Sequence, residues 1–458
     1  MQEKSTSAKS VWSSNGCRPT ASLRKRRKRQ QNVGEPRQND FKLVQSMNLA
    51  SDKMGKAVFW TLCVMGVFAI LSSTMSKTLL NPFAVALGTP TVWSGFVGAA
   101  STIPGILVSL PASSLSDIYG RKKFLLVSGF VFASAPFLYL FISTWWQLIL
   151  VRFYHGFATA IFVPVAEASM AEMYPSQRGE RISFFTSATY VGRSIAPFLG
   201  GYILFSTAST SDPLYNYHIM YLAVAATGLA AFIMALLFLA ERKPPVVAAP
   251  RNQDTLRRMY AGWGALAKNR NVLTVSFVQA SLYYSFGIVD YFLSGYLKDT
   301  LHFDFFSTAA VSGSIIVLAI FVRAYMGRVS DRTGRRTPII VGLLVCSAPL
   351  IALPYTSDLW IILLLSLTYG FGFATATAST CPLMTELAPS RFVGTSTGFL
   401  DTMMDVGQTI GPIVGGFILG TSLGYSGLFL SPTLVLLSAC LVFVLSGVAN
   451  KKINCVEV

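Results

Sequence analysis

The sequence Ser113-Ser114-Leu115-Ser116-Asp117-Ile118-Tyr119-Gly120-Arg121-Lys122-Lys123 is a polar, basic segment between two long apolar stretches. A second copy stands at Gly327-Arg328-Val329-Ser330-Asp331-Arg332-Thr333-Gly334-Arg335-Arg336. The aspartates of the two copies lie 214 residues apart (331 − 117), and each is followed after two residues by Gly-Arg and another cation. A repeat of this length is half of a protein rather than a solenoid unit, so it predicts two related halves.

Each copy combines residue types that suit a tight loop between two membrane helices. Glycine permits the turn, and the aspartate can accept hydrogen bonds from a helix start or pair with an arginine. The basic side chains favour the cytoplasmic side of a membrane. A basic flanking turn of no special function is the alternative, but two copies in register disfavour it. The predicted gating residues are Asp117, Gly120, Arg121 and Lys122 in the first copy and Asp331, Gly334, Arg335 and Arg336 in the second.

The composition indicates a membrane protein. The chain has 458 residues, of which 52% are hydrophobic and 12% are charged, and apolar runs of about 20 residues recur throughout. The net charge of +17 raises the possibility of nucleic-acid binding. All but five of the 37 Lys and Arg residues, however, fall on one side of the membrane once the spans are assigned, and this topology explains the charge without nucleic acid.

Other classes of protein are disfavoured by missing motifs. Six scattered cysteines and three histidines predict neither a disulfide framework nor a metal site. The sequence has no P-loop, no Ser-His-Asp signature and no H-E-x-x-H, so we expect neither an ATP-driven pump nor an enzyme. We expect no cofactor, and a proton gradient as the energy source.

The apolar runs predict twelve spans with both termini in the cytoplasm. The basic tail could bind anionic lipid; equally, the native start could be Met47 or Met54. The predicted divisions are a disordered tail at 1–55, a six-helix half at 56–240, a cytoplasmic linker at 241–271, a second six-helix half at 272–450 and a cytoplasmic tail at 451–458.

The two halves also match after the opening motif. Met170–Ser176 resembles Met384–Ser390, and Gly192–Gly201 parallels Gly407–Gly416. Small residues at four-residue spacing form a stripe on which another helix can pack closely, and a proline can bend the helix. Ordinary small-residue packing is the alternative to a special role. The predicted packing residues are Gly192, Pro197, Gly200, Gly201, Gly407, Gly411, Pro412 and Gly415.

These patterns resemble those of the major facilitator superfamily of secondary transporters. The opening motif and its copy are similar to that family's loops 2–3 and 8–9, Arg152–Gly156 to its R-x-x-x-G pattern, and Gly192–Gly201 to its antiporter motif. Span five departs from the antiporter motif, because it has Ala196-Pro197 where the family usually has Gly-Pro. The resemblance implies an all-α membrane fold of two pseudo-symmetric six-helix bundles, a monomer, and alternating access to a central site.

Eight charged residues fall inside the predicted spans, four of each sign, which suggests that they pair across a polar cavity. Lys77 lies 40 residues before Asp117 (117 − 77) and Asp290 lies 41 before Asp331 (331 − 290), so the two occupy nearly equivalent positions. Either they pair across the central cavity, or they are unrelated charges near the interface. The pathway candidates are Lys77, Arg152, Glu167, Arg193, Asp290, Asp401 and Asp405, with Arg323 as a possible partner.

Two interpretations stay open for each of three sites in the spans: the pair of Asp401 and Asp405, Arg152, and His155. Asp401 and Asp405 lie one helical turn apart, and they are either a proton carrier or a pair engaged by arginine or backbone. The resemblance implies a proton-handling role for Arg152, whereas its chemistry alone also allows a helix-positioning ion pair. For His155 a hydrogen-bonded packing role is favoured over titration.

The leading prediction is a proton-coupled exporter of small organic compounds in the plasma membrane, with lipid, protons and a small molecule as its partners. The alternatives are proton-coupled uptake of a metabolite or organic anion, and a transporter-like sensor or scaffold. The family resemblance implies that Asp117 meets the start of span eleven near Ser390–Ser396, and that Asp331 meets the start of span five near Ser176–Arg181.

Overall fold

The computed structural model describes residues 38–174, 177–207, 214–239, 264, 266, 268–387 and 393–448. The chain divides into a unit of residues 1–56 and a compact unit of residues 57–458. Most of the expected linker at 241–271 and the tail at 451–458 lie outside the described residues. Helix α2 (Gln38–Met75) begins inside the segment 1–55 that was expected to be disordered. Residues 38–55 hold no proline and only one glycine at the end, a composition that suits a helix, and the predicted tail at 1–55 stays a prediction.

The first half of the protein is built entirely from helices in the part that is described. Its first two crossings are each broken into two helices, and the other four are continuous. The helices are α2, α3 (Leu80–Ala86), α4 (Thr91–Ala99), α5 (Ile103–Tyr119), α6 (Arg121–Tyr139), α7 (Trp145–Met173), α8 (Arg178–Ser206) and α9 (Tyr215–Phe238).

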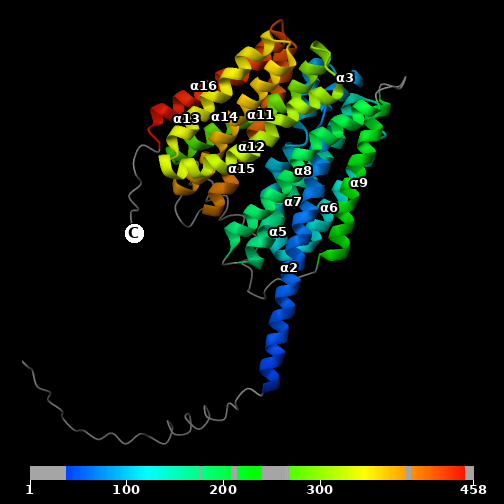
Figure 1. Ribbon diagram of the computed structural model, residues 1–458, viewed down its shortest axis with the longest axis vertical. Helices are drawn as coiled ribbons and strands as arrows, with labels where there is room; N and C mark the ends of the chain where they lie inside the picture. The colour runs from blue at the N-terminus through cyan, green and yellow to red at the C-terminus, as the bar shows by residue number, and fades with distance from the viewer. Residues whose placement is uncertain are drawn as a thin grey trace, which may run out of the picture. The chain divides into compact units, whose positions relative to one another are not determined.

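The second half repeats this order with fewer breaks (Figure 1). A π-helical turn, η1 (Tyr296–Thr300), extends its first crossing, and a short 3-10 turn, η2 (Leu353–Tyr355), extends its third. The helices are α11 (Arg270–Gly295), α12 (Phe305–Thr333), α13 (Arg336–Ala352), α14 (Leu359–Leu387), α15 (Val393–Leu419) and α16 (Gly424–Ser446).

Ten helical segments of the described chain are long and apolar enough to cross a membrane. Helices α8 and α15, with 29 and 27 residues, are long enough but less apolar. They carry the glycine stripes together with Arg193, Asp401 and Asp405. Because they pack inside the bundle against other helices, they do not need an apolar surface all round.

The repeated motif forms the same turn twice. Helix α5 runs through the first copy to Tyr119, and α6 begins two residues later. The glycine between them, Gly120, has φ 97°, and its counterpart Gly334 has φ 87°. Only glycine adopts this backbone conformation without strain, so the tight turn predicted for both copies is confirmed.

Helix packing follows the same plan in both halves. Helix α6 packs on α7 and α9, as α13 packs on α14 and α16, and α5 packs on α7 as α12 packs on α14. Figure 1 shows α2 to α9 in blue to green beside α11 to α16 in yellow-green to red. The predicted fold class, two pseudo-symmetric helical bundles, is therefore confirmed.

The glycine stripes bring helix backbones into direct contact. A Cβ atom on Gly192 would clash with the backbone oxygen of Val67 in α2. A Cβ atom on Gly411 would clash with the backbone oxygen of Tyr284 in α11, and one on Gly407 would clash with that of Ala280. The stripes of α8 and α15 thus pack on the first helix of their own half.

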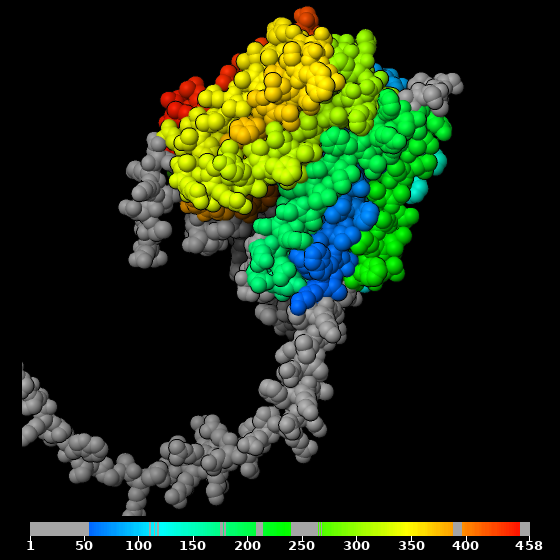
Figure 2. Space-filling model, in the orientation of Figure 1, coloured from blue at the N-terminus to red at the C-terminus, as the bar shows by residue number. Residues whose placement is uncertain are grey.

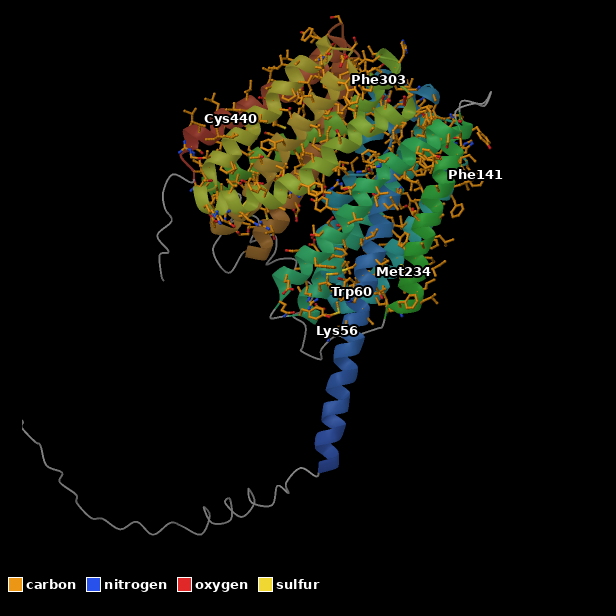
Figure 3. All side chains as sticks on the ribbon, in the orientation of Figure 1. Lys56, Trp60, Phe141, Met234, Phe303 and Cys440 are labelled. Atoms are coloured by element: carbon orange, nitrogen blue, oxygen red, sulfur yellow. The ribbon has the colours of Figure 1, made fainter. Side chains whose placement is uncertain are left out.

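The halves meet mainly through α4 with α15 and α8 with α12. Figure 2 shows the green atoms of α8 against the yellow-green atoms of α12. We call the end of the bundle at Gly120 and Gly334 the motif end, and the opposite end, at residues 139–145, the far end. In Figure 3, Phe141, beyond α6, marks the far end, and Met234, late in α9, lies toward the motif end. One buried cluster holds Leu80 and Tyr217 of the first half together with Phe292 and Leu428 of the second.

The close glycine contacts and hydrogen bonds between described residues of the two halves lie from the far end to the middle of the helices. They include Gly201 against Ala309 and Gly295 against Asn81 near the far end. The contacts that reach deepest toward the motif end join Gly105 with Asp405 and Tyr190 with Arg323. In the described part of the chain, the contacts named here between the halves therefore run from the far end to the level of Asp405 and Arg323.

Substituting a stripe glycine tests this packing. We expect Gly411→Ala to lower the stability of the folded protein by about 1–3 kcal/mol, because the backbone oxygen of Tyr284 has to move. Thermal unfolding of the detergent-solubilised protein measures the change. The control is Gly327→Ala, where no atom lies within 4 Å of the added Cβ. Equal melting temperatures for the two variants would contradict the close contact.

Candidate functional site

A small cavity lies between the halves and brings together three of the charged residues predicted from the sequence. Lys77, Arg152 and Asp290 line it, together with uncharged polar side chains and four glycine, proline or leucine residues. The cavity measures about 10 Å³, room for about one water molecule. The uncharged polar residues in its wall are Thr102, Tyr291 and Gln408.

Two interruptions of the helices position this wall. The first crossing breaks between α2 and α3, at residues 76–79, and Lys77 lies in the break. Leu79 there has φ 56°, a left-handed conformation that a leucine rarely adopts. The second crossing breaks at residues 100–102, before Pro104 in the first turn of α5, and Thr102 faces the cavity. Irregular backbone inside a membrane is tolerated where it lines a polar cavity, so both breaks fit a site here.

Arg152 is the most deeply buried charge at the cavity, with 2% of its surface exposed. One guanidinium nitrogen donates to Ser101 Oγ at 2.7 Å, and Ser101 lies in the break between α4 and α5. Its Nε atom has no hydrogen-bond partner among the described residues. The guanidinium therefore keeps donor capacity for a group that enters the cavity.

His155 follows Arg152 by one helical turn and is equally buried. Its Nδ1 lies 3.4 Å from the hydroxyl of Tyr139, whose ring stacks on Tyr221 at 4.1 Å between centroids. His155 also packs edge-on against Phe132. The residue thus has the hydrogen-bonded packing role expected from the sequence.

Lys77 and Asp290 line the same cavity but do not form an ion pair within 4.0 Å. The Lys77 ammonium interacts favourably with the charges of Asp290 and Asp405 and unfavourably with those of Arg152 and Arg193. Each of these side chains except Arg152 is partly exposed. Lys77 and Asp290, predicted to be equivalent in the two halves, thus lie at one site. A direct ion pair between them that holds one conformation closed stays a prediction.

The remaining acids continue the polar surface from the cavity toward the motif end. Asp405 in α15 lies against Gly105 of α5, where a Cβ atom would clash with its carboxylate. Asp401, one turn closer to the motif end, is exposed, and Glu167 on α7 is half-buried. The charges of Glu167 and Asp401 interact across the two halves. None of these three acids forms an ion pair with a described residue.

Arg323 joins the two halves at this level. Its guanidinium donates to the hydroxyl of Tyr190 in α8 and to Thr377 Oγ1 in α14, the latter at 3.0 Å. It also lies over the Tyr190 ring, 5.7 Å from the centroid. The partner suggested by the sequence was an acid, but the described partners are hydroxyl groups.

Uncharged side chains close the far end above the cavity. Asn81 donates to Ser94 Oγ at 3.2 Å, and that hydroxyl lies 2.9 Å from the hydroxyl of Tyr291 in the other half. At the level of the cavity itself, Thr102 and Thr409 form a second hydrogen bond across the halves, at 2.7 Å. Sequence reasoning missed these residues, because polar uncharged side chains are common in membrane helices and carry no distinctive spacing.

Tyr291 is an aromatic residue in the cavity wall. Two other tyrosines of the second half make contacts within that half: the Tyr284 hydroxyl contacts Ser431 at 2.5 Å, and the Tyr369 hydroxyl contacts Ser285 at 3.0 Å. These two residues belong to its internal packing.

Matching networks stand at the motif end of each half. Arg121 donates to Glu172 at 2.5 Å and to Ser116 Oγ at 2.6 Å. The equivalent Arg335 donates to Glu386 at 2.9 Å and to Ser330 Oγ at 3.1 Å. Each arginine therefore ties the loop to the end of α7 or α14, at positions 214 residues apart.

The second network includes one more acid. Asp331 accepts from Arg335 at 2.5 Å. Partial burial would lower the pKa of the Arg335 guanidinium, but the hydrogen bonds to Asp331 and Glu386 outweigh it and raise the pKa above its ordinary value. The Asp117 side chain and Ser176 lie outside the described residues, so the predicted contacts of Asp117 and Asp331 with the other half stay predictions.

Comparison with known proteins gives a consistent result. A model of the Major Facilitator Superfamily matches residues 62–408 and 324–453. An uncharacterised MFS-type transporter of Methanocaldococcus jannaschii is 25% identical over 343 residues, 73% of this chain and 84% of that protein. The multidrug resistance protein MdtG of Proteus mirabilis is 24% identical, over 74% and 81% of the respective chains.

A solved structure has the same fold. It is a bacterial homologue of the human lysosomal transporter Spinster, in an inward-facing and unoccupied conformation. The TM-score is 0.73 at 14% identity, over 86% of this chain and 97% of the other.

The contact between Arg323 and Tyr190 can be tested by removing one hydroxyl. We expect Tyr190→Phe to lower the free energy of unfolding by about 1 kcal/mol, because a half-buried guanidinium loses an acceptor. Chemical or thermal unfolding in detergent measures it. Tyr202→Phe is the matched control, since Tyr202 is on the same helix and 59% exposed. An equal effect of both substitutions would show that the contact between the halves is unimportant.

Proposed function

Because the chain belongs to the major facilitator superfamily, we propose that it exports small organic compounds in exchange for protons. The protein is a multi-span membrane transporter, and members of its family move solutes rather than catalyse reactions. The proposed mechanism is alternating access, in which the two halves rock about the central cavity. The proposal places the protein in the plasma membrane with both termini in the cytoplasm, and so makes the motif end cytoplasmic.

The observation that carries this proposal is the series of carboxyl groups between the halves. Asp290 lines the cavity, Asp405 lies one level below, and Asp401 and Glu167 follow toward the motif end. None forms an ion pair with a described residue. A carboxyl group held between two mobile walls, without a fixed counter-ion, can bind a proton on one side of the membrane and release it on the other.

Protonation would act on the closure of the motif end. When α15 moves toward α5 and α7, Asp401 and Asp405 lose solvent, and burying an unpaired charge is costly. A proton bound to either acid removes that cost and favours the closed arrangement. Release of the proton on the other side would favour reopening, which couples proton movement to the direction of transport.

Two observations support export. The similar protein MdtG is described as a multidrug resistance protein. The glycine stripe of α8, which resembles the antiporter motif, packs on α2 as the stripe of α15 packs on α11. Uptake of an organic anion is the second candidate, because Lys77 and Arg152 both line the cavity. A sensor that transports nothing would show no saturable, gradient-dependent flux in proteoliposomes.

Coupling can be tested with one variant that removes the acid and another that displaces it. We expect Asp405→Asn to reduce pH-gradient-driven export at least about tenfold, because the neutral amide does not carry the proton. We expect Gly105→Ala to keep transport but change its pH dependence, since the new Cβ atom displaces the intact carboxylate. Dye efflux from right-side-out vesicles, with a pH gradient imposed in either direction, measures both.

Lys268→Gln is the control for that experiment, because Lys268 is exposed and far in sequence from the acids. Full gradient-driven export by Asp405→Asn would exclude Asp405 as the coupling acid. Substrate accumulation under the same gradient, instead of loss, would replace export with uptake.

A further inference from the structure

The charges inside the membrane helices are divided unequally between the two halves. The first half contributes Lys77, Arg152 and Arg193 with a single acid, Glu167, a balance of +2 (3 − 1). The second half contributes one cation and three acids, a balance of −2 (1 − 3). The acids are Asp290, Asp401 and Asp405, and the cation is Arg323.

At the cavity this division produces a positive wall opposite a negative wall. Lys77 and Arg152, from the first half, stand on one side, and Asp290, from the second half, stands on the other. No ion pair within 4.0 Å joins Lys77 or Arg152 to Asp290. Arg152 Nε is also buried without a described hydrogen-bond partner. Separated charges in a membrane interior require compensation from whatever occupies the space between them.

The occupant that compensates both walls carries both signs of charge. We propose that the transported compound is a small zwitterion, with its anionic group between Lys77 and Arg152 and its cationic group at Asp290. This inference rests on the proposed transport function. The hydroxyl groups of Thr102 and Tyr291 and the amide of Gln408 supply neutral hydrogen-bonding groups between the charged ends.

Closure of the site would select this class of compound. In the present conformation the cavity holds about one water molecule, so the walls must part around a ligand. When the halves close, an anion would leave Asp290 buried without a partner, and a cation would do the same to Lys77 and Arg152. Burying one unpaired charge is costly, so only a zwitterion satisfies both walls.

A series of simple amino acids tests the proposal on the full-length protein. The probes are zwitterions of increasing charge separation, namely phenylalanine, 4-aminobutyrate, 6-aminohexanoate and 4-(aminomethyl)benzoate. Each is compared with its N-acetyl derivative, an anion, and its methyl ester, a cation. We expect at least one zwitterion to raise the melting temperature, with an affinity at least about tenfold higher than that of either derivative.

Two variants assign the ends of the ligand. We expect Lys77→Gln to weaken binding of the zwitterion and the N-acetyl derivative about tenfold or more, without changing binding of the ester. Asp290→Asn should weaken the zwitterion and the ester and leave the N-acetyl derivative unchanged. Lys77→Arg should restore most of the affinity. A merely structural role of either residue would weaken all three ligands together, and Lys268→Gln is the control that should change none.

The proposal is overturned if the N-acetyl derivatives or the esters bind as tightly as the zwitterions, or if no zwitterion of the series binds. If a substituted protein fails to fold, the comparison of the three ligand types on the unsubstituted protein still decides. Flux separates this inference from the proposed function. Zwitterion binding without gradient-driven export would contradict proton-coupled export and support the ligand class. Gradient-driven export of singly charged compounds alone would support proton-coupled export and contradict the ligand class.

Discussion

Charge inside a bilayer is tolerated only where another charge, a dipole or water compensates it, and the central surface of this protein follows from that requirement. Lys77, in the break after α2, and Arg152, on α7, line the cavity together with Asp290 of α11. The breaks at residues 76–79 and 100–102 stand at the same place, where freed backbone groups can also meet polar partners. The cavity is thus the one region where charges and irregular backbone support each other.

The two halves are most alike at the residues that determine the geometry of the repeated loop. Arg121 with Glu172 and Arg335 with Glu386 form the same contact, and the glycines before the two arginines adopt the same turn. At the cavity the halves differ, because equivalent positions carry Lys77 and Asp290. A symmetric frame with opposite charges gives the site a polarity across the pseudo-twofold axis. That polarity is a property of the two halves together and is visible in neither half alone.

The sequence predicted the frame and several contributors to the site. Repeat spacing identified the two halves, glycine in the motif predicted the turns, and register relative to the motif placed Lys77 and Asp290 together.

Other features depend on contacts between distant helices. The left-handed Leu79 has no local signal, because leucine rarely adopts that conformation. The pairing of Arg323 with Tyr190, and of Ser94 with Tyr291, required the three-dimensional arrangement, since hydroxyl groups are too common to indicate partners.

The two ends of the bundle close with different chemistry, and this makes the site able to control them. At the far end the halves meet through neutral hydrogen bonds such as Ser94 with Tyr291, and through backbone packing at glycine. A neutral hydrogen bond contributes about 1 kcal/mol net, so a few of them hold the far end with an energy of a few kcal/mol. The pairing or neutralisation of one buried charge at the cavity has an energy of similar size. A ligand shifts an equilibrium only by its differential affinity for the two states. Under the proposed alternating access, occupancy of the charged cavity would therefore be sufficient to decide which end of the protein is open.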